Sequence, residues 1–225
     1  MNLLETEKKS AAKEAVRYLQ NNMVVGLGTG STADYAVKEV GELVKLGLQI
    51  KAVSTSVRTT QLADSLNIPL IDIHSVDVID ITIDGTDEFT QDLLLLKGGG
   101  GALYREKMVA SITKKEIIIA DSSKLVKKLG KFKLPVEIIP SSYYRIVNRL
   151  EDLKGHVFLR KIKDDPFITE QGNHIIDVDF GLINDPASLS ATLDRIDGIV
   201  AHGLFIRLAD KIIMAKGSEL QVFTK

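Results

Sequence analysis

The sequence predicts an α/β protein: a mostly parallel sheet with flanking helices, Rossmann-like, into which a smaller ferredoxin-like α+β domain is inserted. Two observations support this. Short apolar strands alternate with amphipathic helices as far as residue 120, and near Gly130 the order changes to strand, helix, strand, strand, helix, strand. Two last apolar segments, 211–215 and 220–223, are expected to rejoin the first sheet. The predicted domains are therefore 1–130 with 206–225, Rossmann-like and catalytic, and 131–205, the inserted domain.

The first predicted domain contains short strands that alternate with helices. The helices have apolar residues on one face at helical spacing, and the strands are apolar runs bounded by glycine or polar residues. Helices are expected at 5–20, 31–46, 57–66 and 102–112. Strands are expected at 23–28, 50–53, 69–73, 78–83 and 116–120. This alternation predicts parallel strands with helices on both faces of the sheet.

The second predicted domain has a different order of elements. Strands are expected at 135–140, 156–160, 174–180 and 199–205, and helices at 142–150 and 186–196. Prolines bracket the first of these strands, and a loop that contains Asp164-Asp165-Pro166 precedes the third. Strand, helix, strand, strand, helix, strand is the order of a split βαβ, ferredoxin-like unit.

Composition narrows the class of protein. The chain carries 29 basic and 30 acidic residues, so no overall field favours nucleic acid or an anionic membrane. Cysteine is absent, which excludes disulfides, thiolate metal sites and thiol catalysis. The N-terminal residues lack the apolar core of a signal peptide, and no apolar run approaches the ~20 residues that span a bilayer. We therefore expect a cytoplasmic protein without nucleic-acid or membrane partners.

A glycine-rich segment, Gly26-Leu27-Gly28-Thr29-Gly30-Ser31-Thr32, joins a predicted strand to a predicted helix. Unpaired backbone N–H groups and the helix dipole make such a junction an anion site, and its hydroxyl groups suit a phosphate. It is not the dinucleotide fingerprint, because Ser31 stands where a glycine is required, and it lacks the Gly-Lys-Ser/Thr of a P-loop. The structural alternative is a turn with Ser31 as the helix N-cap. We favour a small phosphate ester as the ligand.

An acidic turn, Asp84-Gly85-Thr86-Asp87-Glu88, follows the predicted strand 78–83. Open α/β sheets bind ligands at this edge. Three interpretations are open: a structural turn capped by Asp87, a divalent-metal site, or paired carboxylates that contact sugar hydroxyls and move protons. Because the four histidines show no ligand spacing, we favour the third interpretation over the metal.

Four consecutive glycines, Gly98–Gly101, follow Lys97 and precede the predicted helix that contains Glu106. Glycine loses more backbone entropy on folding than other residues, so such a run is expected where the backbone approaches a ligand. Lys97 is a candidate to stabilise an oxyanion, and Glu106 is a candidate general base. The alternative for Glu106 is a solvated acid paired with a neighbouring base. Lys124 is either part of the same rim or an exposed surface lysine.

Together these segments resemble one known family, ribose-5-phosphate isomerase of type A. The segments that carry the resemblance are Gly26–Ala33, Asp84–Glu88, Lys97–Ala102, Arg105–Lys107, Ile119–Lys124, Gly130–Phe132 and Pro135–Pro140. In order and length the resemblance covers essentially the whole chain. Two departures are visible: Thr86 stands where Ala is expected, and Phe89 where a smaller aliphatic residue is usual. The added hydroxyl of Thr86 is expected to influence sugar preference without removing a catalytic group.

The resemblance implies isomerisation of ribose 5-phosphate and ribulose 5-phosphate in the pentose phosphate pathway, without a metal or organic cofactor. It implies that Glu106 shuttles a proton between C1 and C2 through a cis-enediol, that Lys97 stabilises the enediolate, and that Asp84 assists ring opening. Asp84 and Asp87 would bind sugar hydroxyls. The implied substrate-binding set is Thr29, Gly30, Ser31, Thr32, Asp84, Gly85, Thr86, Asp87, Lys97, Gly98, Gly99, Gly100 and Lys124. The resemblance also implies a homodimer or homotetramer.

This chemistry requires a base that titrates near working pH. An unperturbed glutamate titrates near ~4.3, so we predict that burial raises the pKa of Glu106. Two rival classes remain. One is a non-catalytic sugar-phosphate sensor, which usually carries a helix-turn-helix for which there is little room before residue 23. The other is a coenzyme A transferase or an amino-sugar phosphate deaminase on a related fold.

Overall fold

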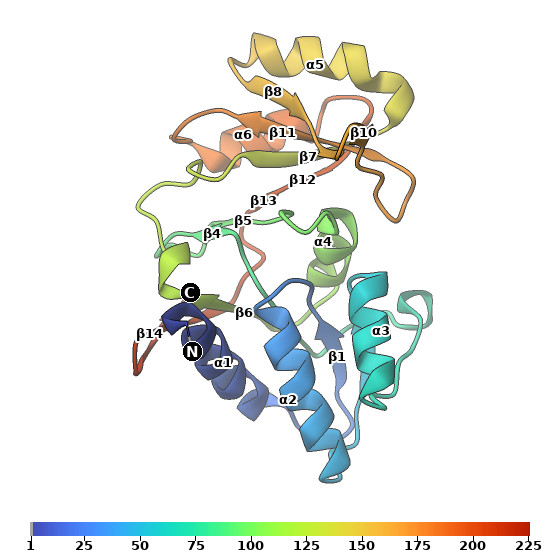
Figure 1. Cartoon of the computed structure of the whole chain (residues 1–225), viewed down its shortest axis with the longest axis vertical. Coiled ribbons are helices and arrows are strands. Elements are labelled where there is room, and N and C mark those ends of the chain that lie inside the picture. The colour runs from blue at the N-terminus through green and yellow to red at the C-terminus, as the bar shows by residue number, and fades with distance from the viewer. Residues whose placement is uncertain (1) are drawn as a thin grey trace.

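The computed structural model describes residues 2–225, and its largest unit is a six-stranded sheet (Figure 1). The strands, in the order in which they lie, are β15 (Glu219–Thr224), β14 (Lys211–Lys216), β6 (Glu116–Asp121), β3 (Ile81–Asp84), β1 (Val24–Leu27) and β2 (Lys51–Ser54). All neighbours are parallel except β14 and β15. The predicted mostly parallel sheet, rejoined by the last two strands, is confirmed.

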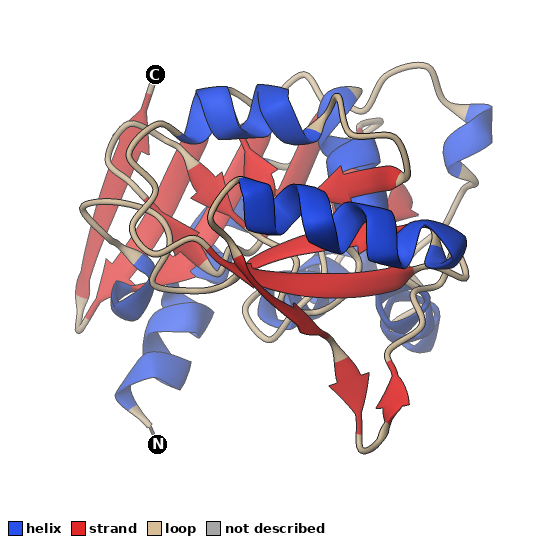
Figure 2. Ribbon diagram, turned by 90° about the horizontal axis from the view of Figure 1, so that it is seen from above, coloured by secondary structure: helices blue, strands red, loops and turns tan. Residues whose placement is uncertain are grey.

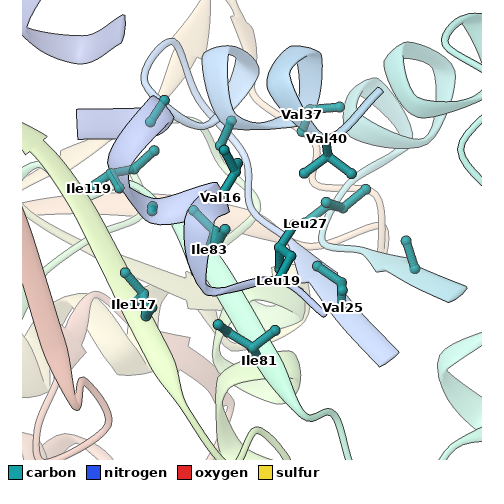
Figure 3. Packing of buried hydrophobic residues seen from close by; sticks show 14 of the residues in the cluster. Val16, Leu19, Val25, Leu27, Val37, Val40, Ile81, Ile83, Ile117 and Ile119 are labelled. Atoms are coloured by element: carbon teal, nitrogen blue, oxygen red, sulfur yellow. The ribbon is translucent and has the colours of Figure 1, made fainter. Parts of the chain in front are cut away.

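Helices cover both faces of this sheet. They are α1 (Leu3–Ala15), α2 (Ala33–Lys45), α3 (Val57–Ser65) and α4 (Leu103–Ser111). Asn2 caps α1 and Ser56 caps α3, each accepting a backbone N–H of the first turn, as expected for these residue types. On one face α1 and α2 pack on a cluster that includes Val25, Ile83 and Ile119 (Figure 3). Because strand side chains alternate, the other face is left for α4.

A second, antiparallel sheet lies at the opposite end of the molecule (Figure 1). Its strands, in order, are β12 (Ile199–His202), β7 (Leu134–Ile138), β11 (His174–Asp179) and β8 (His156–Leu159). Two helices belong to this part of the chain, α5 (Tyr143–Asp152) and α6 (Pro186–Leu193). A pair of two-residue strands, β9 (Lys161–Ile162) and β10 (Asp165–Pro166), projects beyond this sheet (Figure 2).

The boundary between the two predicted domains is not sharp in the core. The apolar cluster of the antiparallel sheet includes Leu96, Leu129 and Leu204 beside its own residues such as Ile138. Leu96 and Leu129 come from outside 131–205, so the two parts share buried surface at this point. The division into 1–130 with 206–225 and 131–205 therefore stays a prediction.

A three-stranded sheet between the two larger ones was not expected. It consists of β13 (Leu204–Phe205), β5 (Leu95–Leu96) and β4 (Glu88–Phe89), in that order. Two-residue strands are too short for an alternation pattern to reveal them. The predicted strand 199–205 is accordingly wrong in one respect, because the chain leaves β12 at Gly203 and continues as β13 in a different sheet.

The predicted strand at 69–73 is also wrong. Only one bridge forms there, between Leu70 and Ala52, and a 3₁₀ turn follows at Ile73–Ser75. Pro69 has no N–H to donate to the sheet, and Asp72 accepts the N–H of His74 to start the turn. Further 3₁₀ turns occur at Val16–Tyr18, Ser122–Lys124 and Pro140–Ser142. None of the helices within residues 2–225 combines the length and the apolar character that a membrane span requires.

Candidate active site

A polar cleft lies at the carboxyl edge of the parallel sheet, where β1, β3 and β6 end side by side. Its lining residues are Thr29, Gly30, Ser31, Thr32, Gly85, Thr86, Asp87, Lys97, Gly98, Gly99, Gly100, Glu106 and Lys124. Every residue that the sequence predicted for the site is in this set except Asp84. Asp84 is only 1% exposed and lies directly beneath the cleft floor. Segments separated by nearly a hundred residues therefore converge on one site.

Three buried ionisable groups meet under this cleft. Lys97 Nζ lies 2.9 Å from Asp84 Oδ2 and 3.6 Å from Glu106 Oε2, and it donates to the carbonyl of Gly85 at 2.6 Å. All three ionisable side chains are at most 4% exposed. Asp84 ends β3, Lys97 follows β5, and Glu106 lies in the first turn of α4. Their contact is thus built by three separate elements.

The carboxyl group of Glu106 is incompletely paired. Its Oε2 is buried and makes no hydrogen bond, since Lys97 Nζ is too distant. Burial raises the pKa of Glu106 to about 8; Lys97 opposes this rise, while Asp84 and Asp87 reinforce it. The predicted rise in pKa agrees with the structure. The alternative of a solvated helix acid is wrong, because Glu106 is buried and its partner is Lys97.

Lys97 carries the positive charge of the site. Burial alone would lower its pKa, but the carboxylates of Asp84 and Glu106 outweigh that effect and hold the pKa above its ordinary value. The amine is therefore a fixed ammonium ion at neutral pH. A fixed, desolvated cation beside an acid–base group can stabilise an oxyanion that forms during proton transfer.

Asp84 acts on its neighbours inside the protein. Its Oδ1 accepts the backbone N–H groups of Thr29 and Gly85, at 3.1 and 2.6 Å, and its Oδ2 faces Lys97. Both oxygens are thus engaged below the cleft floor. Asp84 was expected to contact sugar hydroxyls directly. The geometry instead favours a role in which Asp84 orients Lys97.

Asp87 holds the glycine loop. Its Oδ2 accepts the N–H of Gly99 at 2.8 Å, and a Cβ at Gly99 would lie 2.7 Å from Asp87 Oδ1. Gly98 and Gly101 have φ of +101° and +83°, in the region that side chains disfavour. The loop thus needs glycine for both its conformation and its close approach to Asp87.

Arg160 also supports the glycine loop, and sequence reasoning missed it. Its Nη1 donates to the carbonyls of Gly98 and Gly99, at 2.9 and 3.2 Å. Asp177 fixes the guanidinium through Arg160 Nε at 2.9 Å and through a second, shorter contact. Arg160 and Asp177 come from the antiparallel sheet region, more than 60 residues along the chain, so no local pattern could have indicated them.

The loop between β1 and α2 combines an inward and an outward part. The hydroxyl of Thr29 lies 2.7, 2.8 and 3.1 Å from the hydroxyls of Thr55, Ser56 and Thr59. Its backbone N–H donates to Asp84. Both donors of Thr29 are therefore engaged within the protein, and the expectation that its hydroxyl serves a phosphate is not supported.

The rest of this loop contains Ser31, which is exposed, and Thr32, which is 7% exposed and also lines the cleft. Ser31 Oγ accepts from Lys8 Nζ at 3.1 Å, and the N-cap residue of α2, Thr32, makes no side-chain capping bond. The alternative of Ser31 as a simple N-cap is thus wrong. Lys8, on α1, was not predicted, and no local pattern marks it, because its contact with Ser31 joins residues 23 positions apart. Lys124 lines the cleft, and Lys8, which also pairs with Glu5 at 2.7 Å, reaches its rim through Ser31. Lysines beside the start of a helix suit an anion.

Neighbouring polar residues of the acidic turn are structural. Glu88 accepts the N–H groups of Gly130 and Phe132, at 2.8 and 2.6 Å, and is 4% exposed. Thr86 Oγ1 lies 2.7 and 3.0 Å from the carbonyls of Glu88 and Leu96, so its hydroxyl is satisfied within the protein. Phe89 is fully buried. Within residues 2–225, no group of three or more acidic or histidine side chains is arranged to hold a metal ion.

A buried carboxyl group beside a fixed cation, in a polar cleft at the carboxyl edge of an α/β sheet, is typical of an enzyme that acts on a small polar substrate. A family model described as ribose 5-phosphate isomerase A (phosphoriboisomerase A) matches residues 51–219. The chain belongs to this family, whose members are aldose–ketose isomerases.

Individual relatives agree over almost the whole chain. Ribose-5-phosphate isomerase A of Sphingopyxis alaskensis is 45% identical over 222 residues, which cover 99% of this chain and 97% of the relative. A solved D-ribose-5-phosphate isomerase in complex with phospho-erythronic acid superimposes with a TM-score of 0.96 at 37% identity, covering 100% of both chains. The ribose 5-phosphate isomerase of Plasmodium falciparum gives 0.95 at 36% identity, covering 99% of both.

Proposed function

We propose that this protein interconverts ribose 5-phosphate and ribulose 5-phosphate through a cis-enediol, with Glu106 as the proton carrier. The observation that carries the proposal is the state of Glu106, a buried carboxyl group with one oxygen that makes no hydrogen bond and with a pKa raised to about 8. A general base works best when its pKa lies near the operating pH. The carboxylate takes the proton from C2 of the aldose and returns it to C1, while the hydroxyl proton passes from O2 to O1 as the carbonyl group moves from C1 to C2.

The remaining residues supply charge and orientation. Lys97 faces the oxygen that becomes negative as the C2 proton leaves, while Asp84 holds the ammonium group in position. The Gly98–Gly100 segment lines the same cleft, and it is held by Asp87 at the N–H of Gly99 and by Arg160 at the carbonyls of Gly98 and Gly99. Asp87 is also the carboxylate available to the sugar hydroxyls. The proposed chemistry needs no metal or organic cofactor, since the proton returns to the same molecule.

The phosphate is proposed to bind at the rim formed by Ser31, Thr32, Lys124 and Lys8. One solved relative is in complex with phospho-erythronic acid, a phosphorylated sugar acid, which supports a ligand of this kind. By the same reasoning we propose a cytoplasmic enzyme of the pentose phosphate pathway, acting as a homodimer or homotetramer. We also propose the division into a catalytic part, 1–130 with 206–225, and an inserted part, 131–205.

The test is turnover of ribose 5-phosphate by chelator-treated protein, with Glu106→Gln as the variant. The wild type is expected to turn over, and the variant to lose about 10²–10⁴-fold in kcat while still binding substrate. Glu137→Gln is the matched control, because Glu137 is fully buried, also has an Oε2 that makes no hydrogen bond, and does not line the cleft.

Each outcome has a separate meaning. Control activity close to that of the wild type, with Glu106→Gln inactive, supports the assignment. Turnover that requires added divalent ion would make Asp84 and Asp87 metal ligands instead. Ligand binding without turnover under either condition would favour a sensor over an enzyme.

A further inference from the structure

A fully buried histidine lies outside the cleft, at the point where the chain leaves the antiparallel sheet. His202 ends β12, and its Nδ1 lies 3.2 Å from the backbone N–H of Leu204, which can only donate. Nδ1 is therefore an acceptor, and the ring proton resides on Nε2. Nε2 donates to Asp194 Oδ1 at 2.9 Å. Burial lowers the pKa of His202 to about 4, so the ring is neutral near pH 7.

The turn that His202 stabilises also holds the backbone of Lys97. The residue inside the turn is Gly203, whose carbonyl accepts the N–H of Lys97 at 2.9 Å. The N–H of Gly203 donates to Pro135 at 2.8 Å, and a Cβ at this position would lie 2.3 Å from the carbonyl oxygen of Lys97. Leu204 then pairs with Leu96. A shift of the turn therefore moves Lys97 with it.

The same histidine contacts the helix that carries Glu106. Lys107, the next residue of α4, brings its Nζ to 3.5 Å from His202 Nδ1. The ring of Phe205, in β13, has Lys97 Nζ at 5.5 Å and Lys107 Nζ at 5.1 Å from its centroid. His202 is thus linked to α6 through Asp194, to α4 through Lys107 and to β5 through its turn.

We propose that His202 is a positioning residue that sets the location of Lys97 relative to Glu106. The inference rests on the proposed function of Lys97 and Glu106 and adds a group that touches neither substrate nor reacting atoms. Lys97 contacts Asp84 and Glu106 at 2.9 and 3.6 Å, and a misplacement of about 1 Å at such a site can cost up to ~10²-fold in rate.

The experiment compares His202→Leu with His202→Asn. Leucine removes the acceptor for the N–H of Leu204, whereas the asparagine oxygen can accept the N–H two residues on, as in an Asx-turn. We expect His202→Leu to lower kcat for ribose 5-phosphate by about 10- to 100-fold with KM nearly unchanged. His202→Asn is expected to restore kcat to within about threefold of the wild type.

A pH profile supplies a readout that a merely structural residue would not change. The titratable groups around Glu106 are Lys97, Asp84, Asp87 and Glu116, and Lys97 is the one that lowers the pKa of Glu106. If Lys97 moves away in His202→Leu, the acidic limb of kcat/KM shifts to higher pH. The groups that face His202 are Lys107 and Asp194, and both remain in these variants.

Ser190→Ala is the matched control, because Ser190 Oγ lies 3.5 Å from His202 Nε2, further than Asp194. It should leave kcat and the pH limb unchanged. If His202→Leu is insoluble, Asp194→Ala, at an exposed side chain, should give a smaller fall in kcat with the limb shifted in the same direction. An unshifted limb, or equal activity in the leucine and asparagine variants, would overturn the inference. An inactive wild type would instead refute the proposed function.

Discussion

Two buried glutamates, Glu7 and Glu106, have opposite surroundings. Glu7, on α1, is 1% exposed, and it accepts the N–H and hydroxyl of Ser122 and the N–H of Gly217 at 2.7–2.9 Å. Burial raises its pKa, but these hydrogen bonds outweigh burial and leave the pKa below its ordinary value. Glu106 has no such bonds, and its pKa is about 8. The corner between α1, β6 and β14 fixes a permanent charge, whereas the cleft keeps a group that can exchange a proton.

The largest expected effect comes from replacing the carboxyl group of Glu106. Glu106→Gln should lose about 10²–10⁴-fold in kcat and yet melt at a higher temperature than the wild type at pH 7. The raised folded-state pKa makes Glu106 destabilising once pH exceeds its unfolded value, and glutamine lacks this cost. At pH 3, where the carboxyl group is protonated in both the folded and the unfolded state, the two melting temperatures should agree. If calorimetry finds the variant less stable than the wild type at pH 7, the proposed difference between Glu106 and the hydrogen-bonded Glu7 is contradicted.

The converse change should be visible in stability alone. Glu7→Gln leaves N–H donors imperfectly paired and should cost about 1–3 kcal/mol of unfolding free energy at pH 7. Because the folded-state pKa of Glu7 is lowered, its contribution is present above the unfolded pKa and is lost as pH falls through the folded pKa. Urea unfolding at pH 7 and pH 3 measures this difference. A large fall in the kcat of folded Glu7→Gln protein would disprove the assignment of a structural role to Glu7 and a catalytic role to Glu106.

A smaller shift sharpens the electrostatic account of Glu106. Asp87 raises the pKa of Glu106, so Asp87→Asn should lower that pKa and move the acidic limb of kcat/KM to lower pH. The maximum value of kcat/KM is expected to fall as well, because Asp87 orients Gly99. The pH at which the acidic limb lies does not depend on that maximum. A limb that stays in place would mean that Asp87 is screened from Glu106.

The smallest effect concerns Thr86. Its hydroxyl lies within hydrogen-bond distance of the carbonyls of Glu88 and Leu96, so, like Glu7, it is engaged inside the protein. Thr86→Ala should therefore cost about 0.5–1.5 kcal/mol in stability and leave KM for ribose 5-phosphate unchanged. A KM change of tenfold, or altered preference among phosphorylated pentoses, would return this residue to substrate selection.

The sequence predicts the residues that line the cleft better than the residues that hold them in place. The position of Asp84 follows from the order of elements, because Asp84 ends a strand of the parallel sheet and such strand ends share one edge. Lys97 follows β5 of the unexpected three-stranded sheet and Glu106 lies in α4, so their place beside Asp84 was implied by the family resemblance and not by strand order. Arg160 and Lys8 were missed because their partners lie 62 and 23 residues away, and nothing local marks such pairs. The inward hydroxyl of Thr29 was missed for a related reason, since residue type does not indicate which way a loop side chain turns.

The order of the strands has a consequence for synthesis of the chain. β6 lies between β3 and β14, but residues 134–202, with the entire antiparallel sheet, are made before β14 leaves the ribosome. Until then the edge of β6, which is apolar from Ile117 to Ala120, has no strand to pair with. Unpaired apolar edges of this kind are where nascent chains associate. A stalled or truncated product that stops before Lys211 is therefore expected to be an aggregation-prone substrate for chaperones.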